Sequence, residues 1–161
     1  MNDHFFEETE YAGFWLRLAA FLIDTFIIDV TLYALVLILG LTGYSVWGAE
    51  AFDPVHGNEA VLLAGIMGTI LIISLIGVVG TWLYFAIQES SEAQATLGKR
   101  AVGIIVTDME GERISFGHAT GRFFGKIISS MIFMVGYLMA GFTEQKQALH
   151  DIMAGTLVLK G

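Results

Sequence analysis

The sequence contains no cysteine, a single proline and few charged residues. The absence of cysteine excludes disulfide bonds, thiol catalysis and zinc sites built on cysteine. Charged residues make up only 15% of the 161 residues, whereas hydrophobic residues make up 55%. This balance is too apolar for an ordinary soluble domain, and it predicts a small polytopic membrane protein in a lipid bilayer.

Positive charge is also scarce, because 8 Lys and Arg stand against 16 Asp and Glu, for a formal net charge of −8. Nucleic-acid-binding domains are usually basic, so we expect no nucleic-acid partner. The stretch TLGKR, residues 96–100, lacks the full glycine spacing of a phosphate-binding loop. No catalytic set of Ser, His and Asp is recognisable, so we expect no enzyme, no cofactor and no metal site.

Two long apolar runs are expected to cross the membrane as helices. They cover residues 14–40 and 61–87, and the second run has no charged residue and is long enough to span with some tilt. An acidic lead, residues 1–12, precedes them, and a polar loop, residues 41–60, connects them.

The distribution of basic residues predicts the orientation. The loop 41–60 has none, whereas the loop 88–122 has four: Lys99, Arg100, Arg113 and Arg122. The positive-inside rule places the second loop and the N-terminus in the cytoplasm, which suggests the plasma membrane as the location. There Lys99 and Arg100 are expected to contact anionic lipid or the cytoplasmic surface.

A third apolar segment, residues 123–143, either spans the membrane or re-enters as two half-helices broken near Gly136. Re-entry is favoured, because it returns the C-terminal residues 144–161 to the cytoplasm. TLVLK, residues 156–160, can then pair with VGIIVTD, residues 102–108, which is also expected to form a strand–turn–strand with ERISF, residues 112–116. The predicted fold is therefore an all-α polytopic membrane protein: two full transmembrane helices, a third membrane-embedded segment and a small cytoplasmic β element.

The first membrane helix carries three charged residues at unusual depth. Arg17 and Asp24 share one stripe, since helical positions seven apart lie within about 20°, whereas Asp29 lies about 140° round from Asp24. An Asp near the bilayer centre costs about 2.5–3.5 kcal/mol, so the stripe must face protein, a wet cavity or a cation. Asp24 is either a protonatable cation ligand or part of a structural ion pair, and Arg17 has Asp151 as an alternative partner.

Three further features have two interpretations each. Asp29 is either a second proton or cation site or a polar group bonded to Thr25 or a neighbouring helix. His150 and Asp151 either relay protons or, as we favour, form a capping and hydrogen-bonding cluster. A stripe of small residues lies along the second helix, and packing against the first helix is favoured over an ion path: Gly65, Thr69, Gly77 and Thr81.

These motifs resemble the RDD family of small membrane proteins, named for one arginine and two aspartates. Arg17 and Asp24 match the motif of the first helix, and Asp151 within ALHDIMAGT, residues 148–156, matches the second aspartate. TLGKRAVGIIV, residues 96–106, resembles the stretch between them, although Leu97 stands where proline is common. The resemblance covers about residues 11–160, and it predicts a single transmembrane domain of this type over residues 13–160.

The resemblance implies two classes of function. One is transport of a small ion or solute, with cation/proton exchange through intramembrane carboxylates as the first hypothesis. Two full spans cannot enclose a path, so exchange of a monovalent cation for protons would require a homo-oligomer. The alternative is a non-transporting accessory or scaffold subunit that binds another membrane protein.

Overall fold

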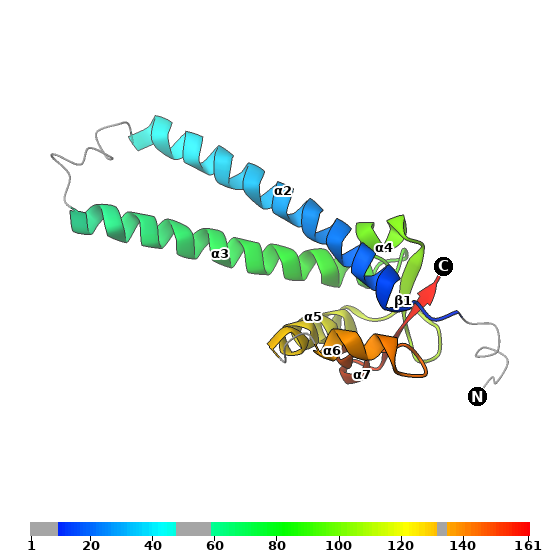
Figure 1. Cartoon of the computed structure of the whole chain (residues 1–161). Coiled ribbons are helices and arrows are strands. Elements are labelled where there is room, and N and C mark those ends of the chain that lie inside the picture. Colours follow the sequence, from blue (N-terminus) through cyan, green and yellow to red (C-terminus); the bar gives the residue numbers. More distant parts are fainter. Residues whose placement is uncertain (1–9, 48–58, 132–134) are drawn as a thin grey trace. The chain divides into compact units, whose positions relative to one another are not determined.

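The computed structural model describes residues 10–47, 59–131 and 135–161, which are mostly helical (Figure 1). Two long helices, α2 (Phe14–Trp47) and α3 (Glu59–Glu89), extend through both of the compact units into which the chain divides. We call Phe26–Thr81 the hairpin unit. We call Met1–Thr25 together with Trp82–Gly161 the base unit.

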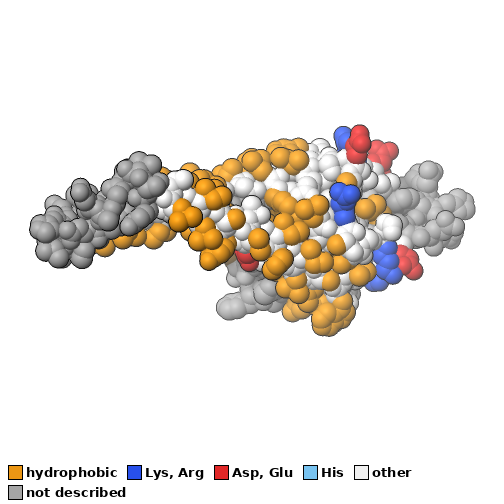
Figure 2. Space-filling model, turned by 90° about the horizontal axis from the view of Figure 1, so that it is seen from above, with side chains coloured by type: hydrophobic (Ala, Val, Ile, Leu, Met, Phe, Trp, Pro, Cys, Tyr) orange, Lys and Arg blue, Asp and Glu red, His pale blue; other side chains and the backbone are white. Residues whose placement is uncertain are grey.

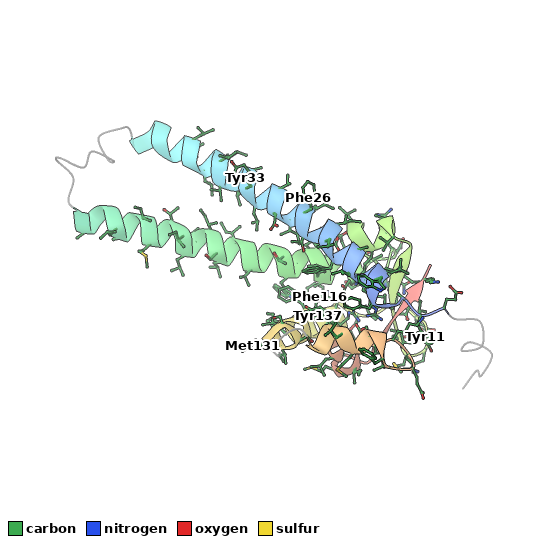
Figure 3. All side chains as sticks on the ribbon, in the orientation of Figure 1. Tyr11, Phe26, Tyr33, Phe116, Met131 and Tyr137 are labelled. Carbon is green, nitrogen blue, oxygen red and sulfur yellow. The ribbon has the colours of Figure 1, made fainter. Side chains whose placement is uncertain are left out.

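The two long helices are apolar enough to cross a membrane, over Phe14–Thr42 and Leu63–Glu89. In the hairpin unit most of their exposed side chains are large and hydrophobic, as the face in Figure 2 shows. Phe26 and Tyr33 on α2, labelled in Figure 3, are 70% and 67% exposed. Surfaces of this kind are stable only in an apolar solvent, which agrees with the expected membrane protein and with two helices that could each span a membrane.

Both helices are longer than expected. Helix α2 continues to Trp47, beyond the predicted end at residue 40, and α3 begins at Glu59 and ends at Glu89. No proline precedes residue 54, so nothing in the sequence stops α2 where its apolar run ends. Residues 41–47 and 59–60 of the expected loop are therefore helical, and residues 48–58 lie outside the described residues.

The stripe of small residues on α3 packs only in part. A Cβ atom at Gly77 would lie 3.7 Å from Leu32 of α2, which is ordinary van der Waals contact. Gly65 has no such neighbour within 4 Å, and Thr69 is exposed with its hydroxyl bonded to the Gly65 carbonyl. Packing on α2 therefore explains Gly77 and leaves Gly65 and Thr69 on an open surface.

The base unit contains a two-stranded antiparallel sheet, β1 (Ile104–Asp108) and β2 (Thr156–Lys160), with Val106 opposite Val158. The predicted pairing of TLVLK with VGIIVTD is thus confirmed. Tyr11 forms a bridge to Leu159 on the other side of β2. Short helices complete the unit: α4 (Leu97–Ala101), α5 (Phe116–Met131), α6 (Val135–Leu138), the 3₁₀ turn η2 (Met139–Gly141) and α7 (Leu149–Met153).

The expected strand at residues 112–116 is wrong. Arg113 makes only an isolated bridge to Thr107, and α5 begins at Phe116. The Ser115 hydroxyl accepts a hydrogen bond from the backbone N–H of His118, as a helix N-cap does, so the chain turns into α5.

The third apolar segment is a broken helix whose pieces pack against one another. A Cβ atom at Gly136 of α6 would lie 2.8 Å from Ser129 of α5. One at Gly125 of α5 would lie 3.0 Å from the Cβ of His150 in α7. The glycines permit these close approaches, so α6 and α7 return alongside α5.

Candidate functional site

Asp24 of α2 lies at the N-terminus of α4, inside the base unit. Its side chain is buried and accepts three hydrogen bonds, from the Tyr84 hydroxyl at 2.7 Å, the Thr96 hydroxyl at 2.5 Å and the Gly98 backbone N–H at 2.7 Å. The Thr96 hydroxyl also accepts a bond from the Lys99 N–H, so Thr96 is the N-cap of α4. Asp24 therefore connects the first membrane helix to the TLGKR segment.

Gly98 is essential to this arrangement because its backbone lies directly against α2. A Cβ atom at residue 98 would lie 2.3 Å from the Ala20 carbonyl oxygen and 2.7 Å from Cγ of Asp24. Backbone cannot yield at such distances, so only glycine fits. The glycine of TLGKR therefore serves helix contact, which gives this motif a structural reason in place of phosphate binding.

Asp151 in the first turn of α7 is the centre of a second buried cluster. One carboxylate oxygen accepts from Arg17 of α2 and from the backbone N–H of Ala148, so the carboxylate also caps α7. The other pairs with Arg122 of α5 at 2.6 Å. Both the alternative partner predicted for Arg17 and the predicted capping role of Asp151 are confirmed.

Glu89, at the end of α3, extends this cluster. Its buried carboxylate accepts from Lys99 at 2.6 Å, from Lys126 at 3.1 Å and from Arg122 at 3.0 Å. Arg122 thus bridges Glu89 and Asp151, which suits the planar fork of a guanidinium, and it also donates to the Thr156 hydroxyl. We call these residues the ion network: Arg17, Glu89, Lys99, Arg122, Lys126 and Asp151.

Burial and charge shift the pKa values of the network outside the membrane helices. For Asp151, burial would raise the pKa, but Arg122 and Arg17 outweigh it and hold the pKa well below its usual range. For Arg122, burial would lower the pKa, but Asp151 and Glu89 raise it. Burial lowers the pKa of Lys99 to about 7 even though Glu89 favours its charged form.

His150 is buried beside the network, and its Nε2 lies 3.4 Å from Asp151. Burial lowers its pKa to about 3, and its Nδ1 is buried without a hydrogen-bond partner among the described residues. His150 is therefore neutral near pH 7, which disfavours the proton relay and suits the capping and packing cluster.

The remaining predicted residues are placed differently. Lys99 is buried against Glu89, so its expected contact with lipid or the cytoplasmic surface is wrong, whereas Arg100 is exposed. Asp29 is exposed on α2 in the hairpin unit, and no side chain in the described ranges bonds to it. The bond expected from Thr25 or a neighbouring helix is therefore not found there.

Sequence reasoning missed the residues that complete both clusters. From the sequence alone, Arg122 is only a marker of orientation, and Glu89 belongs to the expected loop 88–122 because the apolar run ends before it. The sequence did offer one signal. A charged residue at the end of an apolar run can turn its side chain back toward the core of the protein at the end of that helix. The other missed partners are neutral residues with no signal of their own: Tyr84, Thr96, Gly98 and Thr156.

The carboxylates of both clusters are already hydrogen-bonded within the protein. Each carboxylate oxygen of Asp24, Glu89 and Asp151 already accepts from a protein donor. Within the described ranges, no group of three His, Asp or Glu residues could hold a metal ion. The two clusters are suited to joining helices α2, α3, α5 and α7 to the sheet.

Comparison with known proteins gives a consistent result. The model of the RDD family matches residues 11–155. The protein YxaI of Bacillus subtilis (strain 168), described as uncharacterized, is 38% identical over 148 residues, which cover 92% of this chain and 96% of that protein. YteJ of the same organism, described as an uncharacterized membrane protein, is 28% identical over 157 residues, covering 92% and 80%. No solved structure matches the chain.

Proposed function

This chain belongs to the RDD family, and we propose that it is a non-transporting accessory or scaffold subunit for another membrane protein. The observation that supports the proposal is that the carboxylates of Asp24 and Asp151 already have hydrogen-bond partners within the protein. A carboxylate that carries a cation or a proton must exchange its partners, but these two are buried and bonded on both oxygens. Such saturation favours a structural task for the residues that give the family its name.

We further propose that the protein lies in the plasma membrane with its base unit and N-terminus in the cytoplasm. All 8 Lys and Arg belong to Met1–Thr25 and Trp82–Gly161, and none belongs to Phe26–Thr81. The positive-inside rule supports this orientation. The third segment, residues 123–143, belongs to the same proposal as a membrane-embedded element.

A second candidate function, cation/proton exchange by a homo-oligomer, is favoured by Asp29. This acid is exposed near the middle of the span Phe14–Thr42. An acid exposed to hydrocarbon at that depth costs about 2.5–3.5 kcal/mol, unless a cation or a second copy of the chain meets it. If the protein transports, Asp29 is therefore a better carrier than Asp24.

A flux measurement in liposomes separates the two candidates. The purified chain is reconstituted with a pH-sensitive dye inside, and Na⁺, K⁺ or Li⁺ gradients are imposed on vesicles shown to be tight. We expect no cation-dependent proton movement. Flux that is lost in Asp29→Asn and kept in the exposed control Glu112→Gln would contradict the scaffold and support exchange.

Binding of a membrane partner is tested by co-purification from native membranes. Gly65 has open space around it, so Gly65→Leu changes the surface of α3 without a clash. Ser74 is exposed nine positions later, about 180° around the helix, and Ser74→Leu is the matched control. A partner that binds the stripe should be lost only with Gly65→Leu, and a partner retained by both variants would remove this face from the proposal.

A further inference from the structure

Helix α5 has its polarity inverted relative to a helix on the surface of a soluble protein. Its buried residues include Arg122, Ser129 and most of Lys126, beside Ala119 and Phe123. In its second half, from Phe124 onward, the large exposed side chains are apolar, with Phe124 54% and Met131 77% exposed, together with Ile127 and Ile128. A surface helix in water shows the reverse pattern, so the surroundings of this face are apolar.

The elements that follow continue the apolar surface. No charged residue lies between Lys126 and Glu144 in the sequence. Phe142, directly after η2, is 89% exposed, and further large apolar side chains are exposed on α6 and α7: Leu138, Ile152 and Met153. Within the described residues, charged side chains therefore lie only at the ends of this stretch, at Lys126 and from Glu144 onward.

The segment does not cross a bilayer. Helix α5 has 16 residues, about 24 Å at 1.5 Å per residue, which is less than the roughly 30 Å of hydrocarbon. Its beginning and the chain beyond it are joined, since Arg122 pairs with Asp151 at 2.6 Å. The Tyr137 hydroxyl of α6 donates to the Lys126 carbonyl, so the chain has turned back by this point.

Helix α5, which carries the apolar patch, lies beside a helix that could span the membrane. Helix α5 packs on α3, through ring contacts of Trp82 with Phe116 at 5.9 Å and of Phe85 with Phe123 at 6.5 Å. In the same unit, Trp15 and Leu22 of α2 are exposed as well. The solvent that covers these faces also reaches α5.

We propose that α5, α6, η2 and α7 form a re-entrant hairpin that inserts into one leaflet only, the leaflet on the same side of the membrane as the two-stranded sheet. Acyl chains of that leaflet cover Phe124, Met131 and Phe142. The pair of Arg122 with Asp151 closes the hairpin at its base, and α5 extends only about 7.5 Å beyond Lys126 before it ends at Met131. The insertion is therefore shallow. This inference rests on the proposed membrane location of the protein, with the base unit at the cytoplasmic surface of the membrane, and is independent of whether the protein transports.

The absence of cysteine allows a direct test with single-cysteine variants of the full chain in liposomes. Phe124→Cys, Met131→Cys and Phe142→Cys are labelled with a fluorophore and quenched with lipids brominated at a shallow or a deep acyl position. Arg100→Cys and Glu144→Cys, both exposed and polar, are the matched controls. We expect the greatest loss of fluorescence at the three apolar positions with the shallow bromines, and little loss at the controls.

Sidedness is measured on the same samples with a membrane-impermeant maleimide. Glu110→Cys before the hairpin and Gly161→Cys after it should be labelled from the same side. Labelling from opposite sides, or strongest quenching by the deep bromines, would overturn the proposal in favour of a span. Labelling of Met131→Cys from water, or its cross-linking between copies in place of lipid quenching, would overturn it in favour of an exposed or protein-covered face. None of these results depends on flux or co-purification.

Discussion

Arg17 in the first membrane helix forms an ion pair with Asp151 of α7, across 134 positions of sequence. The same guanidinium donates to the carbonyl oxygens of Ala12 and Lys146, so it joins α2 to segments from both ends of the chain. The second oxygen of Asp151 pairs with Arg122, which continues the connection to Glu89 of α3. The ion network is therefore a continuous tie between both membrane helices and the C-terminal elements.

Replacing the central cation should destabilise the protein strongly. Arg122→Met leaves Glu89 and Asp151 buried with fewer partners, and breaking a buried ion pair costs about 3–5 kcal/mol. The free energy of unfolding is measured by denaturant titration in bicelles. Arg100→Met is the matched control, because Arg100 is exposed on the neighbouring α4, and it should change stability by less than about 0.5 kcal/mol. Equal effects of the two variants would mean that the network contributes nothing specific.

Adding one methyl group at residue 98 should disturb the contact between α4 and α2. Gly98→Ala would bring Cβ to 2.3 Å from the Ala20 carbonyl oxygen, and overpacking of this kind costs about 1–3 kcal/mol. Gly121→Ala is the control, since this position in α5 has no neighbour within 4 Å and alanine favours a helix by about 1 kcal/mol. Thermal unfolding in the same detergent should therefore shift down for the first variant and slightly up for the second. A Gly98→Ala protein as stable as the native chain would rule out the close contact.

The sequence predicts the features that depend on helical periodicity or on the pairing of two apolar strands. Arg17 and Asp24 are two turns apart on one helix, and the strands around Val106 and Val158 carry the apolar residues that a buried pair requires. Burial of charge was not predictable in the same way. From the sequence, Lys99 belongs to the expected basic loop 88–122, and only the fold shows that Glu89 is within reach of it.

The two halves of the naming motif are held by different segments for a physical reason. Spacing predicts that Arg17 and Asp24 lie on the same face of α2, but it does not predict which segments cover that face. In the structure the face meets two different segments, α7 at Arg17 and α4 at Asp24. Which segment covers each turn of a helix depends on tertiary contacts across the whole base unit, and local sequence does not contain that information.

Acid should weaken the protein through His150. Burial lowers its pKa to about 3 in the folded state, from an ordinary value near 6.5, so the unfolded chain binds the proton first as the pH falls. The stabilisation that the buried imidazole of His150 contributes is fully present above pH 6.5 and is lost as the pH falls toward 3. Over this range the free energy of unfolding falls by up to about 1.4 kcal/mol per pH unit. We expect His150→Met to flatten the decline in unfolding free energy between pH 6.5 and 4.

The exposed His118 of α5 provides the control for that experiment. His118→Met should keep the decline of the native chain, because an exposed imidazole is solvated in both states. Asp151 adds to the decline only at lower pH, since its pKa is held below its usual range. Its stabilisation is present at higher pH and is lost as the pH falls through that lowered value. A His150→Met protein with an unchanged pH profile would show that the buried imidazole is not responsible.

The two aspartates of the first helix should respond in opposite ways to the same change. Asp29 is exposed within the span, so Asp29→Leu should favour the membrane-inserted state by about 3–4 kcal/mol. Asp24→Leu should destabilise the fold, because it leaves the donors of Tyr84, Thr96 and Gly98 unpaired at about 1–3 kcal/mol each. The inserted fraction and the thermal unfolding of both variants are measured in the same lipid. If Asp29→Leu lowers stability as Asp24→Leu does, then Asp29 has a partner in the membrane, and the exchange or oligomer hypothesis gains over the scaffold.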